Sequence, residues 1–164
     1  HLDALLVWSA LPRDLRATTH PVAAADYWER GPVRRLVSKR GLNALLIRRD
    51  DPRQALEALG AAMKEGRSIV IFPEGTRGAD RLPGPFKPGL HRIALDFPEA
   101  ELRPCFLDNP GRALPKGRLL PIPFACAVRF GPPLERIAGE GRPAFLARAR
   151  EAVVALAPPE PAAS

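Results

Sequence analysis

The chain has few cysteines, few aromatic residues and no long apolar run. Its two cysteines, Cys105 and Cys126, lack C-x-x-C spacing, so neither a metal site nor a disulfide scaffold is indicated, and a reducing compartment is the simpler assumption. No apolar run approaches the roughly 18 residues that a membrane-spanning helix needs. Aromatic residues make up only 6% of the chain, and there is no P-loop, zinc-ligand spacing or aromatic RNA-binding motif. We therefore expect no metal and no nucleic-acid partner.

Lysine is scarce as well, although the chain is basic. The 25 basic residues outnumber the 18 acidic ones, which gives a net charge of +7, and arginine supplies all but four of the basic side chains. The planar guanidinium group matches phosphate oxygens in pairs, so this balance favours a phosphate-bearing partner or an anionic surface. A genomic base composition that favours arginine, alanine and proline would explain the same counts, and both explanations stay open.

The pattern of apolar residues predicts the fold class. With 164 residues and 46% hydrophobic content, the chain is long enough for one domain with a core. Short apolar runs alternate with amphipathic stretches, which predicts an α/β domain with a mostly parallel central sheet flanked by helices. We expect this domain to span residues 1–157 and residues 158–164 to form a disordered tail.

The expected elements follow from the same pattern and from their capping residues. Strands are predicted at residues 21–26, 43–49, 68–72, 102–107 and 124–131. Helices are predicted at residues 4–11, 27–41, 54–66, 88–97 and 143–157. The helix at 27–41 is interrupted and basic, so it would either lie on an anionic membrane surface or present an ordinary solvated face.

The strongest chemical signal is the string FPEGTRG at Phe72–Gly78, directly after the clearest strand. Ligands of α/β sheets collect at the carboxyl ends of the strands. In this string Gly75 lets the backbone approach a ligand, Thr76 offers a hydroxyl, and Arg77 can fork onto phosphate oxygens. Glu74 can orient a basic or hydroxyl partner. From the residues alone, a structural turn with an internal Glu74–Arg77 ion pair explains the string equally well.

Four stretches together carry a resemblance to a known family. FPEGTRG resembles the third sequence block, usually FPEGTRS, of the 1-acyl-glycerol-3-phosphate acyltransferases, with Gly78 in place of serine. FKPG at Phe86–Gly89 resembles the extension of that block, and LRPCFLDN at Leu102–Asn109 resembles the fourth block. NALLIRR at Asn43–Arg49 fits the second block, GxxFIxR, loosely. The resemblance covers nearly the whole chain and implies the glycerolipid acyltransferase fold.

The resemblance also implies roles for basic residues. In the family the arginine at the position of Arg49 is associated with the phosphate of the acceptor, and Arg77 would hold the same phosphate. Lys87 and the helix start at Gly89 would add positive potential near that anion. Without the resemblance, Arg49 is an exposed basic strand end and Lys87 a solvated loop lysine.

The first family block, HxxxxD, is incomplete in the chain. The run after His1 resembles the family sequence that follows the motif histidine, which places Asp3 at the motif aspartate. The expected histidine then lies three residues before His1, outside the chain, because His1 itself has the wrong spacing. Asp3 as a simple helix N-cap is the alternative, and the two roles are compatible. His20 and His91 have no partner at a family spacing and are predicted to be structural.

The function that the resemblance implies is direct acyl transfer. A histidine oriented by Asp3 would remove the proton from the acceptor hydroxyl, which attacks the thioester of acyl-CoA or acyl carrier protein, and Glu74 would assist. The expected acceptor is a lysophospholipid, 1-acyl-glycerol-3-phosphate, and the product phosphatidic acid. No cofactor is expected, and the enzyme would be associated with the cytoplasmic face of a membrane. The alternative is a non-catalytic module that binds lipid phosphate, and without the histidine we expect the chain to be inactive.

Overall fold

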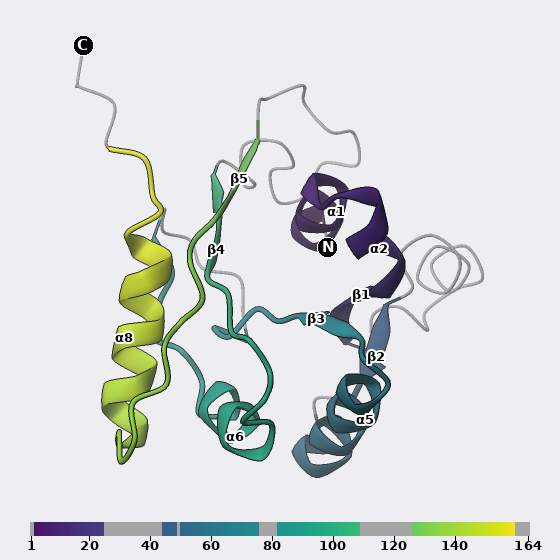
Figure 1. Cartoon of the computed structure of the whole chain (residues 1–164). Helices are drawn as coiled ribbons and strands as arrows, with labels where there is room; N and C mark the ends of the chain where they lie inside the picture. The colour runs from purple at the N-terminus through teal and green to yellow at the C-terminus, as the bar shows by residue number, and fades with distance from the viewer. Residues whose placement is uncertain (1, 25–43, 49, 76–81, 109–125, 160–164) are drawn as a thin grey trace. The chain divides into compact units, whose positions relative to one another are not determined.

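A computed structural model describes residues 2–24, 44–48, 50–75, 82–108 and 126–159 (Figure 1). The chain forms two compact units, His1–Phe72 and Pro73–Ser164. The elements of the first unit are α1 (Leu2–Ala10), α2 (Arg13–Thr18), β1 (Thr19–Ala24), β2 (Leu45–Ile47), α5 (Pro52–Lys64) and β3 (Ser68–Val70). Those of the second are α6 (Gly89–Asp96), β4 (Cys105–Asp108), β5 (Ala127–Phe130) and α8 (Arg142–Val154).

The first unit contains a parallel sheet in the order β2-β1-β3. The first half of β1 pairs with β3, from Thr19 opposite Ser68 to Pro21 opposite Val70, and its second half pairs with β2. Pro21 is fully buried and stands where pairing passes from one neighbour to the other, a margin of the ladder where proline is tolerated. Because the strands are parallel, the carboxyl ends of β2 and β3 lie at the same edge of the sheet.

Helix α5 lies beside β2 and β3 and has a defined signal at each end. The Asp51 carboxylate accepts a hydrogen bond from the Gln54 N–H (3.0 Å), and Pro52 occupies the first turn. At the other end Gly66 has φ +76°, and the N–H groups of Gly66 and Arg67 bond back to the last helical turn. This is the Schellman arrangement.

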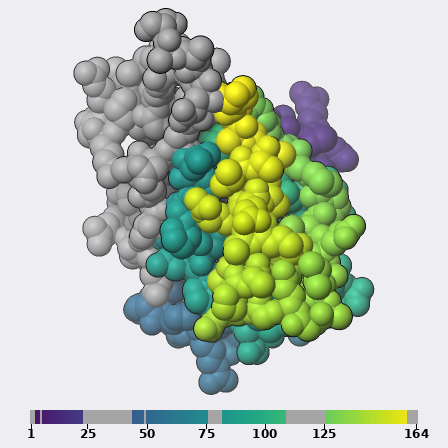
Figure 2. All heavy atoms as spheres, turned by 90° about the vertical axis from the view of Figure 1, so that its left-hand side faces the viewer, coloured from purple at the N-terminus to yellow at the C-terminus, as the bar shows by residue number. Residues whose placement is uncertain are grey.

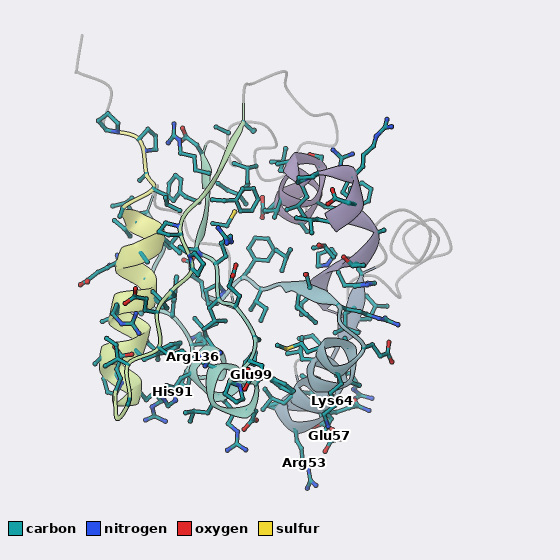
Figure 3. All side chains as sticks on the ribbon, viewed as in Figure 1. Arg53, Glu57, Lys64, His91, Glu99 and Arg136 are labelled. Atoms are coloured by element: carbon teal, nitrogen blue, oxygen red, sulfur yellow. The ribbon has the colours of Figure 1, made fainter. Side chains whose placement is uncertain are left out.

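Helix α5 is amphipathic. Its buried residues are Leu59, Gly60 and Ala62, while Arg53, Glu57 and Lys64 lie on one outer side (Figure 3). Arg53 and Glu57 form an exposed ion pair one turn apart (3.1 Å).

Trp8 of α1 and Arg16 of α2 link the two helices through side-chain contacts. The Trp8 indole N–H donates to the Arg16 carbonyl (3.1 Å), and the Arg16 guanidinium lies 5.5 Å from the centre of the Trp8 ring. The same guanidinium donates to the carbonyl of Ser9 (2.6 Å), in the last turn of α1, and to that of Leu11 (2.7 Å), just after the helix. Both helices contact β1, so α1 and its first-turn Asp3 are fixed on the sheet.

In the second unit, β4 and β5 form an antiparallel pair, with Cys105 opposite Phe130 and Asp108 opposite Ala127. Backbone bonds extend the pairing beyond the strands, from the Gly131 N–H to the Pro104 carbonyl (2.9 Å) and from the Leu134 N–H to the Leu102 carbonyl (2.7 Å). Gly131 is buried, and a side chain there would approach Pro104.

Helix α8 contacts both β4 and α6. Phe145 and Ala149 on α8 are buried, and the rings of His91 and Phe145 meet edge to face at 5.3 Å. The Arg148 guanidinium forms a two-bonded pair with the Glu140 carboxylate (2.6 and 2.8 Å) and lies over the Phe145 ring. Figure 2 shows α8 and the segment leading into it on one face of this unit.

The carboxyl end of α6 is closed by one side chain from a distant segment. The Arg136 guanidinium donates to the carbonyl of Ala94, in the last turn of α6, and to those of Phe97 (2.9 Å) and Ala100 (2.7 Å), which follow the helix. His91 and Arg136 lie around α6 in Figure 3.

The structure confirms the predicted fold class, with a parallel sheet flanked by helices. The strand expected at residues 102–107 begins only at Cys105, after Pro104, which has no N–H to donate. Helix α2 was not predicted, and it contains no buried residue that would have marked it by periodicity. The helix expected at 27–41 lies outside the described residues. The single domain over residues 1–157 stays a prediction.

Candidate functional site

The turn that carries the start of the FPEGTRG string follows β3 directly. Its Pro73 carbonyl accepts a hydrogen bond from the Lys87 N–H (2.8 Å), which ties the turn to the residues just before α6. Gly75 has φ +71°, in the left-handed region that favours glycine. A residue with a side chain would therefore strain the backbone here. The approach of a ligand to the Gly75 backbone stays a prediction.

The Glu74 side chain bonds to the backbone ten residues further along the chain. One oxygen of its carboxylate accepts a hydrogen bond from the Gly84 N–H (2.7 Å), in a partly buried position. A Cβ atom on Gly84 would lie 3.3 Å from that oxygen, so glycine leaves room for the approach. Gly84 was not among the predicted site residues. Its position between Pro83 and Pro85 was the sequence signal that could have indicated it.

Lys87 and Gly89 lie at the start of α6. A Cβ atom on Gly75 would be 3.6 Å from Cγ and 3.8 Å from Cε of Lys87, so the lysine stem passes beside the turn. Within the described part of the chain, no side chain caps the N-terminus of α6, and no atom lies within 4 Å of a Cβ placed on Gly89. Uncapped backbone N–H groups and a nearby ammonium group favour an anion at this place.

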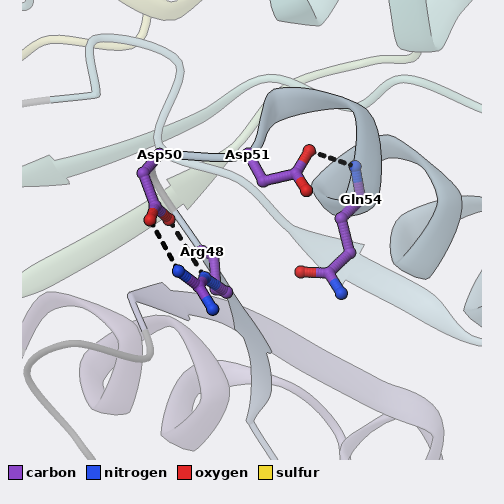
Figure 4. A network of polar contacts seen from close by, with 4 residues as sticks. All are labelled: Arg48, Asp50, Asp51 and Gln54. Atoms are coloured by element: carbon purple, nitrogen blue, oxygen red, sulfur yellow. Dashed lines mark hydrogen bonds and ion pairs between the residues drawn. The ribbon is translucent and has the colours of Figure 1, made fainter.

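The carboxyl end of β2 carries a second basic position. Arg48 forms a two-bonded ion pair with Asp50 (2.7 and 3.1 Å), next to the Asp51 cap of α5 (Figure 4). The hydrogen bond from Arg48 lowers the pKa of the exposed Asp50 carboxyl. Of the two adjacent arginines, Arg48 takes part in this local ion pair, and the predicted phosphate ligand is its neighbour Arg49.

The structure brings together four of the predicted residues: Glu74, Gly75, Lys87 and Gly89. Asp3 lies in the first turn of α1, partly buried, and belongs to the first unit. Its place beside the turn stays a prediction. Arg49, Thr76 and Arg77 lie outside the described residues, so their roles also stay predictions.

Three further properties of the described residues bear on what the protein can do. Across these parts of the chain, His, Cys, Asp and Glu side chains form no group of three that could hold a metal ion. Burial raises the pKa of the Cys105 thiol to about 11, which makes it a poor nucleophile at neutral pH. Within the part of the chain that the structure describes, no helix combines the length and apolarity needed to cross a membrane.

The model of the acyltransferase family matches residues 1–109, about two thirds of the chain. The chain belongs to this acyltransferase family. The match includes the FPEGTRG string, and it ends before β5 and α8. The family prediction made from the sequence blocks is therefore confirmed.

Three plant proteins are similar in sequence. The chain is 38% identical over 74 residues to the chloroplastic 1-acyl-sn-glycerol-3-phosphate acyltransferase BAT2 of Brassica napus, a match of 43% of this chain and 21% of that protein. It is 36% identical over 74 residues to the chloroplastic LPAT1 of Arabidopsis thaliana, with 43% and 20% covered. The relative in Limnanthes alba is 30% identical over 92 residues, with 54% and 32% covered. The matches thus span between a fifth and a third of these relatives.

One solved structure shares the fold. The 1-acyl-sn-glycerophosphate acyltransferase PlsC of Thermotoga maritima superposes with a TM-score of 0.63 at 22% sequence identity. The superposition covers 85% of this chain and 56% of that one. The predicted glycerolipid acyltransferase-like fold is confirmed by this likeness.

Proposed function

We propose that the complete protein transfers an acyl group from an acyl thioester to the free hydroxyl of 1-acyl-glycerol-3-phosphate, which gives phosphatidic acid. Membership of the acyltransferase family supports the reaction type, and the names of the plant relatives support the acceptor. The observation that carries the proposal is the turn after β3, where Glu74, Gly75 and Lys87 meet the uncapped start of α6.

The acceptor phosphate is proposed to bind at this turn. The Lys87 stem runs beside Gly75, whose lack of a side chain leaves the backbone open, and the N-terminus of α6 adds its positive end. Arg77 and Arg49 would add the two guanidinium groups that the family resemblance implies. Holding the phosphate in this way converts binding energy into orientation of the hydroxyl.

The chemical step is proposed to use a histidine held by Asp3. The imidazole takes the proton of the acceptor hydroxyl, the oxygen attacks the thioester carbonyl, and the carbon–sulfur bond breaks. The imidazolium then returns the proton to the leaving thiolate, so the products are phosphatidic acid and a free thiol. Asp3 would fix the imidazole tautomer and stabilise the imidazolium. No cofactor is needed in this scheme, whose donor is acyl-CoA or acyl carrier protein and whose place is the cytoplasmic face of a membrane.

The proposal is tested by extending the chain with three residues, the first of which is histidine, directly before His1. Phosphatidic acid formed from lysophosphatidate vesicles is measured by mass spectrometry with acyl-CoA and with acyl carrier protein as donors. We expect turnover with histidine at the first added position and none with alanine there. Asp3→Asn in the histidine version should lower kcat on the order of a hundredfold or more.

The control outcome separates the enzyme from a binding module. If both versions bind lysophosphatidate vesicles and neither forms product, the protein is a non-catalytic module for lipid phosphate. Product formed by the alanine version would show that the histidine has been placed wrongly.

A further inference from the structure

In the second unit, one peptide group has both its N–H and its carbonyl hydrogen-bonded to charged side chains. The N–H of the Pro83–Gly84 peptide donates to the Glu74 carboxylate (2.7 Å). The carbonyl of the same peptide accepts a hydrogen bond from Nε of Arg150 on α8 (2.9 Å). Both bonds are partly buried, so water competes for them less than at an open surface.

The two bonds support each other physically. No described peptide bond is cis, so in this trans peptide the N–H and the carbonyl point in opposite directions, and the carboxylate and the guanidinium approach from opposite sides. A cation at the carbonyl polarises the peptide and strengthens its N–H as a donor, while an anion at the N–H strengthens the carbonyl as an acceptor. Loss of Arg150 should therefore weaken the bond to Glu74 as well.

Arg150 is fixed by the helix that carries it. It follows Ala149, which is buried, and Phe145 one turn earlier is buried against His91 of α6. Helix α8 is therefore held in place by packing. The hydrogen bond from Arg150 on α8 in turn holds the peptide that bonds to Glu74. Residues 142–154 lie outside the stretch that matches the family model. The contact therefore joins Pro83, inside the match, to Arg150, outside it.

We propose that Arg150 is a positioning residue for the acceptor site. Through the Pro83–Gly84 peptide it holds Glu74, and thereby keeps the turn at Gly75 beside Lys87. The inference rests on the proposed function, because it assigns the turn to the acceptor phosphate. Arg150 touches no substrate in this scheme and acts only through the peptide.

The test compares Arg150→Met, which keeps an unbranched apolar stem and removes the donors, with Arg150→Lys, which keeps a charged donor. Arg142→Met is the matched control, since Arg142 is exposed at the start of the same helix. Hydrogen exchange of the Gly84 amide is measured in the chain, and KM and kcat are measured in the histidine-extended protein. We expect Arg150→Met to speed Gly84 exchange about tenfold, Arg150→Lys to do so less, and Arg142→Met to leave it unchanged.

The kinetic readout distinguishes positioning from a general loss of folded protein. A smaller folded fraction lowers apparent kcat and leaves KM unchanged, whereas a displaced phosphate site raises KM for lysophosphatidate and leaves KM for the acyl donor unchanged. We expect a rise in acceptor KM of about tenfold in Arg150→Met and a smaller rise in Arg150→Lys. An unchanged acceptor KM, or unchanged Gly84 exchange, would overturn the inference.

Failure of the proposed function is separable from failure of this inference. Gly84 exchange needs no turnover, and vesicles containing lysophosphatidate give an acceptor affinity in its absence. A protein that transfers no acyl group would refute the proposed function. Vesicle affinity that is weakened by Arg150→Met and unchanged by Arg142→Met would then still support Arg150, and equal affinities would overturn it.

Discussion

Gly75→Ala isolates the conformational demand of the turn after β3. Among the described residues, a methyl group at this position would meet Lys87, at 3.6 and 3.8 Å, which are ordinary contact distances. The described neighbours give no clash, so the expected cost is that of a residue with Cβ at φ +71°. That strain is roughly 1 to 2 kcal/mol, partly offset by about 0.4 to 1 kcal/mol because alanine lowers the entropy of the unfolded chain. We expect a net loss of about 1 kcal/mol.

Two other glycines give matched controls for this substitution. Gly66 also has a positive φ, +76°, and no described atom lies within 4 Å of a Cβ placed there, so Gly66→Ala should cost about the same as Gly75→Ala. Gly89 has open space and an ordinary φ, so Gly89→Ala should be neutral or slightly stabilising. For a chain of this size, about 1 kcal/mol corresponds to roughly 2 to 4 °C in the midpoint of thermal unfolding.

Activity separates Gly75 from Gly66. Thermal unfolding followed by circular dichroism should show similar losses for both variants. In the histidine-extended protein, KM for lysophosphatidate should rise only in Gly75→Ala. The reasoning is refuted if Gly75→Ala unfolds at the wild-type temperature, because the strain would then be absent. It is also refuted if Gly66→Ala raises the acceptor KM as much, because the effect would then not come from the turn.

Two further predictions concern the packing and the charges of the second unit. Gly131→Ala would place a methyl group 3.0 Å from the ring of Pro104, so we expect a loss of about 1 to 3 kcal/mol in urea unfolding; wild-type stability would mean that the strands separate easily. The hydrogen bonds from Arg148 lower the pKa of Glu140, so this carboxylate stabilises the fold at neutral pH and the contribution is lost as pH falls through the lowered pKa. Between roughly pH 6 and pH 3, Glu140→Gln should lose less stability than the wild type; parallel curves would contradict the assignment.

The sequence predicted those elements that combine periodicity with a capping or breaking residue. Helix α5 has Asp51 and Pro52 at its start and Gly66 after its end, and it lies where it was expected. Helix α2 has neither a buried face nor a side-chain cap, so the sequence offered no signal for it. The antiparallel pairing of β4 with β5 depends on which strands meet in space, and apolar runs do not encode that choice.

The candidate site was predictable where one short string holds the chemistry. Glu74 and Gly75 lie in FPEGTRG, and Lys87 and Gly89 in the extension of that block, so proximity in sequence indicated proximity in space. Arg150 could not be found in this way. It contacts Pro83 across 67 positions of the chain, and in sequence it is one of the three arginines of α8.

The hydrogen bond between the Gly84 N–H and the Glu74 carboxylate bears on whether Glu74 takes part in proton transfer. Glu74 was predicted to be catalytic together with Asp3, yet its carboxylate accepts the Gly84 N–H, which itself depends on Arg150. A carboxylate that moves to accept a substrate proton would release this peptide and loosen the turn that we assign to the phosphate. The geometry therefore favours Glu74 as a residue that shapes the turn, and in our proposal proton transfer belongs to a histidine oriented by Asp3. Binding and proton transfer would then belong to different sequence blocks, the third and the first.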